Sequence, residues 1–489
     1  MLDFLNDLLW GKVLLVLLVA VGIGFTIASR FVQFRYFGRM FRILGAGEAF
    51  KRDKHGHLSS FQALVLSVAG RVGGGNIAGV AVAITLGGPG AIFWMWLVGL
   101  MGMATSFLEC TLAQTFKQAE GDGSYRGGPA YYIVKGLGKG WGWLAGFYSV
   151  LLLITFGFAF TALQSYSVAT SFGDAFGVPV LYSGIALAIV VGLIIFGGIK
   201  RIARISEVLV PVMAVGYLLI TVIIVGMNID RVPEMFVLIV KSAFGLEPAV
   251  GGGIGAAIMM GLKRGLFSNE AGLGSAPNVA AVAYVPHPAN QGIVQAFSVF
   301  IDTVIICSAT AFLILLSDAY IPGASGNVEG IALTQAALAD HVGEWGRTFV
   351  SLALLLFAFS TILYNYYLGE NSLHFFSRDN QKLFNGFRIA IVLLVCWGAT
   401  TDLGTVFGFA DVTMGMLAVV NLIALILLFK PGLRILKDFD DQFRKGIKRP
   451  VFDVRQHPEL DLDAKAWELE PEDMERLQDL PDSSPARSS

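Results

Sequence analysis

The stretch Gly73-Gly74-Gly75-Asn76 lies in the middle of a hydrophobic segment, residues 59–86, that is long enough to cross a membrane. Glycine destabilises a helix interior by about 1 kcal/mol relative to alanine, so three in succession predict a helix that is broken at mid-depth. A break frees backbone N–H and C=O groups, which hydrocarbon cannot solvate. It is tolerated only where these groups line a protein cavity or bind a ligand. We therefore expect a broken membrane span with a binding site at the break.

A second interruption lies in a later apolar segment, residues 249–285, around Phe267-Ser268-Asn269. Two broken spans at corresponding places in the two halves of a chain are typical of the binding site of a secondary transporter. We therefore expect both interruptions to belong to one site. The glycines of the second interruption are Gly261, Gly265, Gly272 and Gly274.

The composition is that of a polytopic membrane protein. Hydrophobic residues make up 55% of the 489 residues and charged residues only 15%, whereas a soluble domain has about 25% charged residues. The mean hydropathy is +0.68, and the apolar runs reach the roughly 20 residues needed to cross a bilayer core. We expect a lipid bilayer as the surroundings, and the formal net charge of −1 gives no indication of a nucleic-acid partner.

Hydropathy predicts eleven transmembrane helices in an all-α protein. The N-terminal decapeptide contains neither Lys nor Arg, whereas basic residues follow the first helix and recur in alternate loops. Because cytoplasmic loops carry an excess of Lys and Arg, we expect the N-terminus outside and the C-terminus in the cytoplasm. The predicted helices cover residues 8–31, 59–86, 90–116, 141–171, 179–199, 205–228, 249–285, 290–316, 347–371, 385–401 and 409–430.

The helix count suggests two related halves. Apart from the first helix, the others divide into two units of five, and each unit begins with a broken span. An odd number of helices inverts the second unit relative to the first, as in the five-plus-five inverted repeat of alternating-access transporters. We also expect a short surface helix at 331–341, and an amphipathic helix near 461–479 in an otherwise mostly solvated tail. The divisions are residues 1–58 (N-terminal transmembrane helix and basic cytoplasmic linker), 59–228 (first repeat), 229–248 (external segment), 249–430 (second repeat) and 431–489 (charged cytoplasmic tail).

The peptide groups of the first break, from Ala69 to Ile77, are predicted to offer two kinds of ligand. The half-helix that ends there exposes carbonyls, which suit sodium, and the half-helix that begins there exposes N–H groups, which attract a carboxylate. A zwitterionic amino acid together with a sodium ion fits such a pair of helix ends. The alternative is that the glycines only allow close packing between helices.

Charged side chains accompany the second break. Lys263, Arg264 and Glu270 lie near the predicted bilayer midplane, where an unpaired charge costs about 2.5–3.5 kcal/mol or more. Asp302 and Arg71 lie at similar depth in other spans. We expect Asp302 to pair with Arg71, Lys263 or Arg264, and we interpret these charges chiefly as structural ion pairs rather than as ligands for a substrate.

Uncharged polar side chains are the better candidates for ligand contacts. Ser268 and Asn269 are short and lie beside the second break. Ser360 and Thr361 are adjacent hydroxyls deep in an aromatic helix and could bind a hard cation, although Ser and Thr often bond their own helix backbone instead. Gln164 is the only amide in its span, and its partner could be a neighbouring helix or a ligand.

The motifs around both breaks are similar to those of a known family. Gly75-Asn76-Ile77-Ala78-Gly79-Val80-Ala81, followed by Leu86-Gly87-Gly88-Pro89-Gly90-Ala91, and Arg264-Gly265-Leu266-Phe267-Ser268-Asn269-Glu270-Ala271-Gly272 resemble the alanine/glycine:cation symporter family. The resemblance extends over residues 8–430 and leaves out the tail. It implies a LeuT-like fold with one extra N-terminal helix, in the cytoplasmic membrane of a bacterium or archaeon. It also implies sodium-driven import of small neutral amino acids, typically alanine and glycine.

The resemblance further assigns roles to individual residues. In that family both broken helices contact the substrate, and the sodium site combines carbonyls before the first break with paired hydroxyls on the eighth core helix. The position of Gly74 often holds threonine there, so glycine implies a somewhat larger substrate, or a pocket filled by water or a side chain. The implied substrate contacts are Gly74, Gly75, Asn76, Phe267, Ser268 and Asn269, to which we add Gln164; the implied sodium ligands are Ala69, Val72, Ser360 and Thr361, with a carbonyl of Phe357.

We therefore expect a sodium-coupled symporter that is not an enzyme and has no organic cofactor. Proton coupling through Glu270 or Asp302 is the alternative among transporters. A membrane-embedded enzyme has less support, because the predicted spans contain no His cluster, paired-Asp dyad or Gly-x-Ser nucleophile. A passive channel is disfavoured by the paired internal breaks, which are typical of transporters.

Overall fold

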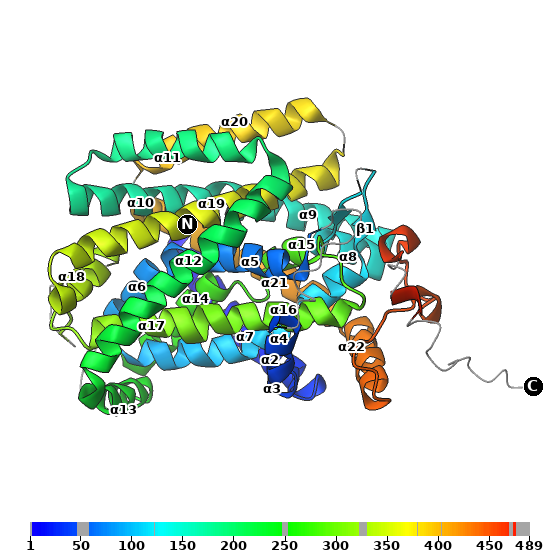
Figure 1. The fold of residues 1–489 in the computed structure, drawn as a ribbon, viewed down its shortest axis with the longest axis horizontal. Helices are drawn as coiled ribbons and strands as arrows, with labels where there is room; N and C mark the ends of the chain where they lie inside the picture. Colours follow the sequence, from blue (N-terminus) through cyan, green and yellow to red (C-terminus); the bar gives the residue numbers. More distant parts are fainter. Residues whose placement is uncertain are drawn as a thin grey trace, which may run out of the picture.

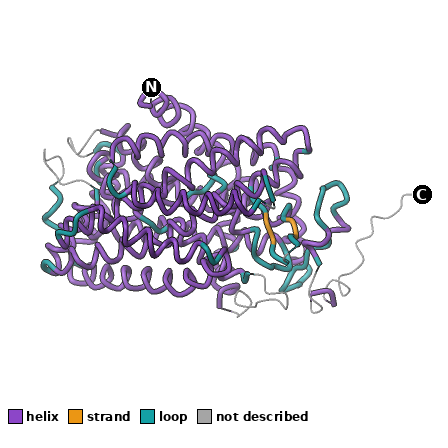
Figure 2. The backbone as a smooth tube through the Cα atoms, turned by 90° about the horizontal axis from the view of Figure 1, so that it is seen from above, coloured by secondary structure: helices purple, strands orange, loops and turns teal. Residues whose placement is uncertain are grey.

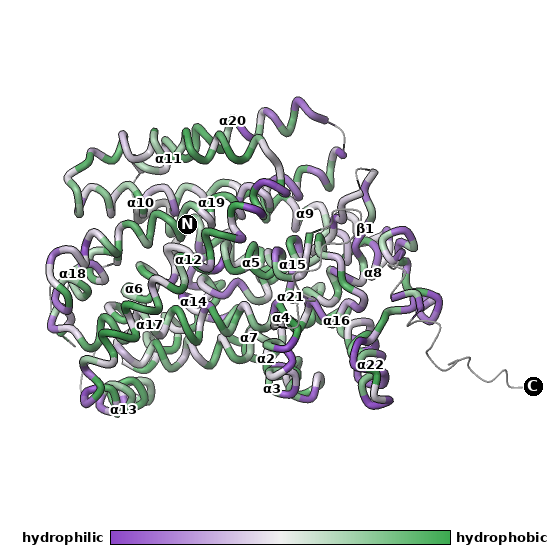
Figure 3. Tube along the Cα trace, viewed as in Figure 1, coloured by the Kyte–Doolittle hydropathy of each residue, from purple (hydrophilic) through white to green (hydrophobic). Residues whose placement is uncertain are grey.

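A computed structural model describes residues 2–45, 58–121, 123–246, 253–321, 330–378, 380–401, 403–468 and 473–475 of the chain. Most of the long helices run roughly along the long axis of the molecule (Figure 1). Seen from above, the described backbone is nearly all helical, and the two short strands lie toward the C-terminal end (Figure 2). Hydrophobic residues dominate the long helices, whereas hydrophilic residues gather toward the two ends, for example on α22 (Phe429–Arg444) (Figure 3).

Helices of membrane-spanning length confirm the polytopic character predicted from the sequence. Among the described residues, eight helices are long and apolar enough to cross a membrane, or nine if one bent pair is counted as a span. A shorter apolar helix, α11, covers Val180–Ile195. The eight are Phe4–Ala28, Gly90–Thr115, Lys139–Phe176, Gly198–Met227, Pro288–Leu315, Trp345–Phe376, Gln381–Gly398 and Phe407–Leu427.

The individual elements have the following bounds. Along the first half they are α1 (Leu2–Leu8), η1 (Leu9–Val13), α2 (Leu14–Ala28), α3 (Val32–Arg35), α4 (Phe37–Gly45), α5 (Ser60–Arg71), η3 (Gly75–Gly79), α6 (Val80–Gly87), α7 (Gly90–Thr115), β1 (Gln118–Ala119), β2 (Tyr125–Arg126), α8 (Pro129–Leu137), η4 (Lys139–Trp141), α9 (Gly142–Leu152), η5 (Leu153–Phe160), α10 (Thr161–Phe176), α12 (Gly198–Met227), η6 (Ile229–Arg231) and α13 (Val232–Ala243). Along the second half they are α14 (Gly253–Asn269), α15 (Ser275–Ala280), α16 (Pro288–Val299), η7 (Phe300–Ile306), α17 (Cys307–Leu315), α18 (Ile331–Val342), α19 (Trp345–Phe376), α20 (Gln381–Gly398), α21 (Leu403–Leu427), η8 (Val454–Gln456) and η9 (Ala464–Trp467).

The first predicted break is confirmed. α5 begins with a capping box, in which the Ser59 hydroxyl accepts from the Gln62 N–H and the Gln62 side chain accepts from the Ser59 N–H, each at 3.1 Å. The α-helix ends at Arg71, and the chain resumes at Gly75 as a single π-helical turn that leads into α6. The two halves are bent by 49°. The interruption therefore lies at the three glycines, as predicted.

The second break is present but lies later in the chain than predicted. Phe267, Ser268 and Asn269 form the last turn of α14, and the helix stops only after them. Glu270, Gly272 and Gly274 have positive φ values of 55°, 89° and 80°. Left-handed residues cannot continue a right-handed helix, so the loop 270–274 separates α14 from α15.

Segments predicted on opposite sides of the membrane lie at opposite ends of the molecule. α13 and α18, from the stretches predicted to be external, are at one end, and α8, β1 and α22 are at the other (Figure 1). α18 confirms the helix expected at 331–341, but half of its residues are buried rather than at the surface.

The described part of the tail is packed against the body rather than mostly solvated. Phe439 of α22 is buried, and Phe452 and Trp467 form a buried cluster with Tyr125. The Trp467 indole donates to the carbonyl of Thr115 at the end of α7, at 3.3 Å. Aromatic side chains within the acidic tail therefore hold it in place. The amphipathic helix expected near 461–479 falls partly outside the described residues, and the described part contains the 3₁₀ turn η9.

Candidate functional site

The two broken spans meet at a buried hydrogen-bonded cluster. The Asn76 amide nitrogen, in the first break, donates to the Ser268 hydroxyl of α14 at 3.0 Å. Both side chains also donate to the carboxylate of Asp302 in η7, Asn76 at 2.6 Å and Ser268 at 3.0 and 2.8 Å. Thr303 donates to the same carboxylate at 2.7 Å. Asp302 thus joins the first break to the helix that ends at the second.

The predicted ion pair between Asp302 and a nearby cation is wrong. Asp302 receives its hydrogen bonds from neutral amide and hydroxyl groups. Arg71 instead donates to the Gln295 carbonyl at 3.2 Å, to the Ser106 hydroxyl at 3.0 Å and to the Ser298 hydroxyl. The guanidinium therefore joins α5 to α7 and α16 through neutral oxygens.

Lys263 and Arg264 share a carboxylate that the sequence analysis did not identify. Asp411 of α21 lies 2.6 Å from the Lys263 ammonium and 3.3 Å from the Arg264 guanidinium, and all three side chains are buried. The Trp10 indole of the N-terminal helix donates to the Asp411 carbonyl at 3.1 Å. The two ion pairs join α14 to α21, and the Trp10 hydrogen bond joins α21 to the N-terminal helix. This agrees with the interpretation of Lys263 and Arg264 as members of structural ion pairs. Asp411 could have been proposed as a partner, because it is an acid within a predicted span and needs a counter-charge.

Four of the five predicted sodium ligands converge between α5 and α19. The Thr361 hydroxyl lies 2.8 Å from the Ala69 carbonyl and 3.0 Å from the Phe357 carbonyl. The Ser360 hydroxyl lies 2.9 Å from the Phe357 carbonyl and 3.4 Å from that of Ala69. Two carbonyl and two hydroxyl oxygens of this kind are suitable ligands for a hard cation. The fifth residue, Val72, closes α5 with its N–H bonded to the Val68 carbonyl at 2.8 Å.

The N–H groups freed by the first break are capped by side-chain amides. The Gly73 N–H donates to the Asn76 side chain at 2.9 Å, and the Gly74 N–H donates to the Gln164 side chain of α10 at 3.0 Å. Gln164 thus has its partner on a neighbouring span, which is one of the two alternatives that the sequence left open. A bound carboxylate could replace either amide oxygen, since both accept hydrogen bonds from the same type of donor.

Gly73 lies between the candidate cation ligands on α5 and α19 and the side-chain amides that cap the break, and both are close to it. A Cβ atom at Gly73 would lie 2.6 Å from the Thr361 hydroxyl and 3.3 Å from the Gln164 amide nitrogen. Only a residue without a side chain fits between them. The candidate cation ligands and the candidate anion donors are therefore on neighbouring residues of one short segment.

Phe267 covers the first break from the side of α14. A Cβ atom at Gly75 would lie 2.9 Å from its ring. The Phe267 ring packs against Phe160 of η5 and Phe407 of α21, with centroid distances of 4.9 and 6.3 Å. The aromatic group thus closes one side of the region around Gly75.

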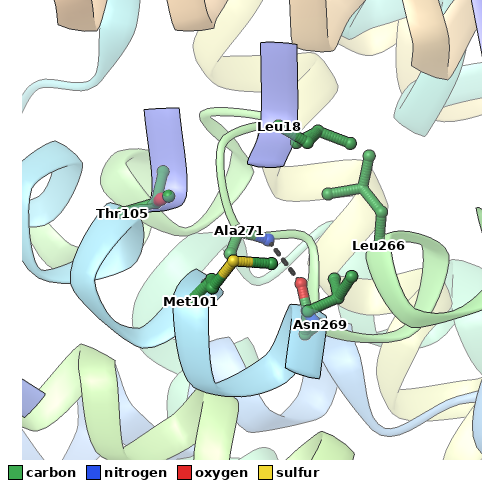
Figure 4. A pocket seen from close by; sticks show the side chains of 9 residues that line it. Leu18, Met101, Thr105, Leu266, Asn269 and Ala271 are labelled. Carbon is green, nitrogen blue, oxygen red and sulfur yellow. Dashed lines mark hydrogen bonds between the residues drawn. The ribbon is translucent and has the colours of Figure 1, made fainter. Parts of the chain in front are cut away.

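Asn269 points away from the cluster around Asn76. Its side-chain oxygen accepts from the Ala271 N–H at 3.0 Å, and it lines a pocket with Leu18 of α2 and Met101 and Thr105 of α7 (Figure 4). Among the described residues, its buried amide nitrogen has no hydrogen-bond partner. The structure therefore does not bring this predicted substrate contact together with the other six.

One contact of the first break comes from a segment to which no chemistry was assigned. The Thr334 hydroxyl of α18 donates to the Ile77 carbonyl, in the π-helical turn, at 3.2 Å. Thr334 lies far from this turn in the sequence, and no local pattern indicates the contact. α18 therefore adds a hydroxyl donor to a carbonyl that also accepts from the Val80 N–H of its own helix.

The family model and the relatives that this chain resembles are all transporters. Residues 1–454 match the family model described as the sodium:alanine symporter family. The chain is 48% identical to the probable sodium/glutamine symporter GlnT of Bacillus subtilis, over 91% of each chain. It is 46% identical to the amino-acid carrier protein AlsT of the same organism, over 95% of this chain and 97% of that protein. It is 39% identical to a sodium/proton-dependent alanine carrier protein of Bacillus sp. PS3, over 84% and 94% respectively. The family and these relatives are transporters and not enzymes.

Proposed function

We propose that this chain, which belongs to the sodium:alanine symporter family, imports a small neutral amino acid together with sodium by alternating access. Sodium-coupled symport of an amino acid is the activity that the family and the named relatives support. The choice of amino acid, the ion ligands and the transport cycle described below are our proposals for this chain.

The observation that carries the proposal is the arrangement on either side of Gly73. The Ala69 carbonyl lies 2.8 Å from the Thr361 hydroxyl, while the Gly74 N–H is bonded to Gln164 at 3.0 Å. Sodium would bind the oxygens of Ala69, Phe357, Ser360 and Thr361, with Val72 as a further carbonyl. In doing so it would fix the first break in the shape that presents its N–H groups to a carboxylate.

The amino acid would then bind across the two broken spans. We place its carboxylate at the N–H groups of residues 74–76, where it would displace the Gln164 side chain. We place its ammonium near Phe267 and Ser268, where the carboxylate of Asp302 accepts from the Ser268 hydroxyl. A tenfold coupling between sodium and substrate requires only about 1.4 kcal/mol of differential binding between the two states.

The lack of a side chain at Gly74 affects how large a substrate can bind. A Cβ atom at this position would lie 3.1 Å from the Gln164 side-chain oxygen and 3.5 Å from the Ser167 hydroxyl. The Gln164 side chain therefore lies where a threonine side chain would extend, and space for a larger substrate opens only when Gln164 moves. We propose alanine, glycine or a somewhat larger neutral amino acid as the substrate. Relatives named for glutamine and for alanine span this range.

The proposed architecture is a LeuT-like inverted repeat with eleven transmembrane helices. Residues 59–228 and 249–430 would form the two five-helix units, each beginning with a broken span, and the N-terminal helix would lie outside them. The bend of 49° in the first unit and the loop 270–274 in the second support this division. We place the N-terminus outside and the C-terminus in the cytoplasm of a bacterial or archaeal cell.

The test is uptake of radiolabelled alanine into proteoliposomes that contain the purified protein. With an inward sodium gradient we expect accumulation above the external concentration, and with choline in place of sodium we expect none. Equal uptake in sodium and choline would contradict sodium coupling. Uptake that only reaches the external concentration would indicate a passive pathway.

Proton coupling is the second candidate, because Asp302 is a buried carboxylate whose hydrogen bonds come from neutral groups. Glu270 is similar, with hydrogen bonds from the Ser275 hydroxyl at 2.6 Å and the Tyr364 hydroxyl at 3.2 Å. One relative is named a sodium/proton-dependent alanine carrier. Accumulation driven by a pH gradient in choline would favour this candidate, and loss of that accumulation in D302N or E270Q would identify the residue.

A further inference from the structure

The loop 270–274 at the second break is held by a closed set of side-chain contacts around Gly272. The Gly272 N–H donates to the carboxylate of Glu109 in α7 at 3.3 Å. The Gly272 carbonyl accepts from the amide of Asn421 in α21 at 2.9 Å. The same amide donates to the other carboxylate oxygen of Glu109 at 3.2 Å. We call Glu109, Asn421 and Gly272 the Gly272 clamp.

The clamp leaves the Asn421 amide with one possible orientation. Its nitrogen donates to both the Gly272 carbonyl and Glu109, and its oxygen accepts from the Tyr132 hydroxyl. A rotated amide would face the Gly272 carbonyl and Glu109, which are both acceptors, with its own oxygen. Glu109 and Asn421 are both fully buried. Losing one side chain would leave a buried donor or acceptor of the remaining partners without its hydrogen bond in the clamp.

The clamp replaces the hydrogen bonds that a continuous helix would make. Gly272 has φ +89°, which L side chains rarely adopt, and a Cβ atom there would lie 3.0 Å from Leu422. The next carbonyl, of Leu273, accepts from the Tyr148 hydroxyl of α9 at 3.3 Å. The unwound loop is thus bonded to side chains of α7, α9 and α21, and it is stable in this form only while they remain in place.

We propose that Glu109 and Asn421 are positioning residues that hold the second break unwound, and that they determine the rate of transport rather than the affinity for sodium. This inference rests on the proposed function for its transport readout. Asn421 lies on α21, whereas Gly272 lies in the loop between α14 and α15. Because the clamp joins these elements, we expect the loop to keep its unwound form throughout alternating access, and a loop that also adopts other forms would slow the cycle. Neither residue belongs to the predicted cation ligands on α5 and α19.

The experiment compares E109A, E109Q and N421A with two matched controls in full-length protein. The controls are T111V on α7 and T413V on α21, because within the described part of the chain each hydroxyl bonds only a carbonyl of its own helix, at 2.7 and 3.2 Å. The first readout is hydrogen exchange by mass spectrometry of peptides that cover residues 270–280 and 69–79. The second is the maximal rate of uptake and the sodium concentration that gives half of it.

We expect E109A and N421A to exchange about tenfold faster at 270–280, since each removes a hydrogen bond to a charged or buried group. Exchange at 69–79 should not change. Their maximal uptake rate should fall about tenfold, while the sodium concentration for half-maximal uptake stays within about twofold of wild type. E109Q keeps an oxygen for the Gly272 N–H but loses the acceptor for the Asn421 amide, so its transport rate should lie between the rates of E109A and the wild type.

Several results would overturn the inference. Unchanged exchange at 270–280 in E109A and N421A would show that the clamp does not hold the loop, whether or not the protein transports alanine. A weaker sodium dependence at an unchanged maximal rate would place Glu109 in the ion site. An E109Q variant as inactive as E109A, with a flattened pH profile, would make Glu109 a proton carrier instead. If E109A does not fold, E109Q and N421A decide the question. Failure of wild-type uptake would refute the proposed function, and the exchange measurement would still test the clamp.

Discussion

The two breaks show the same sequence signal, glycines within an apolar span, but their freed backbone groups have different partners. At the first break the Gly73 and Gly74 N–H groups are bonded to neutral amides, and the Ala69 carbonyl to a neutral hydroxyl. At the second, Gly272 is bonded to the carboxylate of Glu109 and to Asn421. A carboxylate ligand or a cation can replace neutral partners, whereas the second set is complete within the protein. We infer that the first break binds ligands and the second is a fixed turn.

The largest expected effect comes from removing both hydroxyls of the first break's cation group. S360A/T361A should abolish sodium-stimulated uptake, because two of the four converging oxygens are lost. Alanine uptake at increasing sodium concentrations measures this. S372A on the same helix is the control, since the Ser372 hydroxyl bonds the Leu368 carbonyl of its own helix at 2.9 Å. An unchanged sodium dependence in the double variant would remove the cation assignment and, with it, the contrast between the two breaks.

The charges beside the second break should affect stability rather than transport selectivity. D411N leaves Lys263 and Arg264 buried without their carboxylate. Loss of one partner of a buried ion pair typically costs about 3–5 kcal/mol, so the melting temperature should fall by several degrees or more. Thermal unfolding in detergent measures this, with T413V as the control on the same helix. A D411N variant with normal stability and an altered substrate preference would place these charges in the binding site instead.

The Q164A variant tests whether the N–H groups of the first break bind the substrate. In the wild type the substrate carboxylate would take the place of the Gln164 side-chain oxygen at the Gly74 N–H, and the released oxygen would accept from the substrate ammonium. Q164A removes that second contact, so we expect the KM for the amino acid to rise about tenfold, equivalent to about 1.4 kcal/mol. T161V on the same helix is the control, because the Thr161 hydroxyl bonds the Phe156 carbonyl at 3.0 Å. A normal KM with a reduced maximal rate would mean that Gln164 serves the conformational change and not binding.

The smallest effect is expected for Gly74. G74T adds atoms close to Gln164 and Ser167, so it should shift the ratio of KM values by a few-fold toward smaller amino acids. One additional methylene in a binding site changes the free energy of binding by only about 1–3 kcal/mol. Competition of glycine, alanine and larger neutral amino acids with labelled alanine measures the shift, and G74A provides an intermediate size. An identical competition profile in all three proteins would show that position 74 does not line the pocket.

The first break was accessible from the sequence because its signal is local: three glycines and an asparagine mark it. The cation ligands were assigned through the family resemblance, since adjacent hydroxyls alone left bonding to their own helix open, and four of the five converge. The residue at which the second break begins could not be predicted from the sequence. Glu270, with φ +55°, has no local preference for the left-handed conformation. Long-range contacts hold it, including those of Ser275 and Tyr364.

The partners of the buried charges also depend on tertiary structure. Asp302 was predicted to pair with a cation, but helix packing places neutral donors around it and brings Asp411 to Lys263 and Arg264. Hydropathy identifies which residues are at membrane depth but does not show which helix faces which. The packed tail was missed for the same reason. Phe452 and Trp467 lie in a charged segment, and their burial depends on the surface offered by Tyr125 and the end of α7.

The central proposal is that sodium and the amino acid bind at the first break. The most direct measurement is an experimental structure of the protein with sodium and alanine bound. We predict density for the ion among the oxygens of Ala69, Phe357, Ser360 and Thr361, and density for the carboxylate of alanine at the N–H groups of residues 74–76. Ligand density at the loop 270–274, with the Gly73 and Gly74 N–H groups still bonded to Asn76 and Gln164, would contradict binding at the first break.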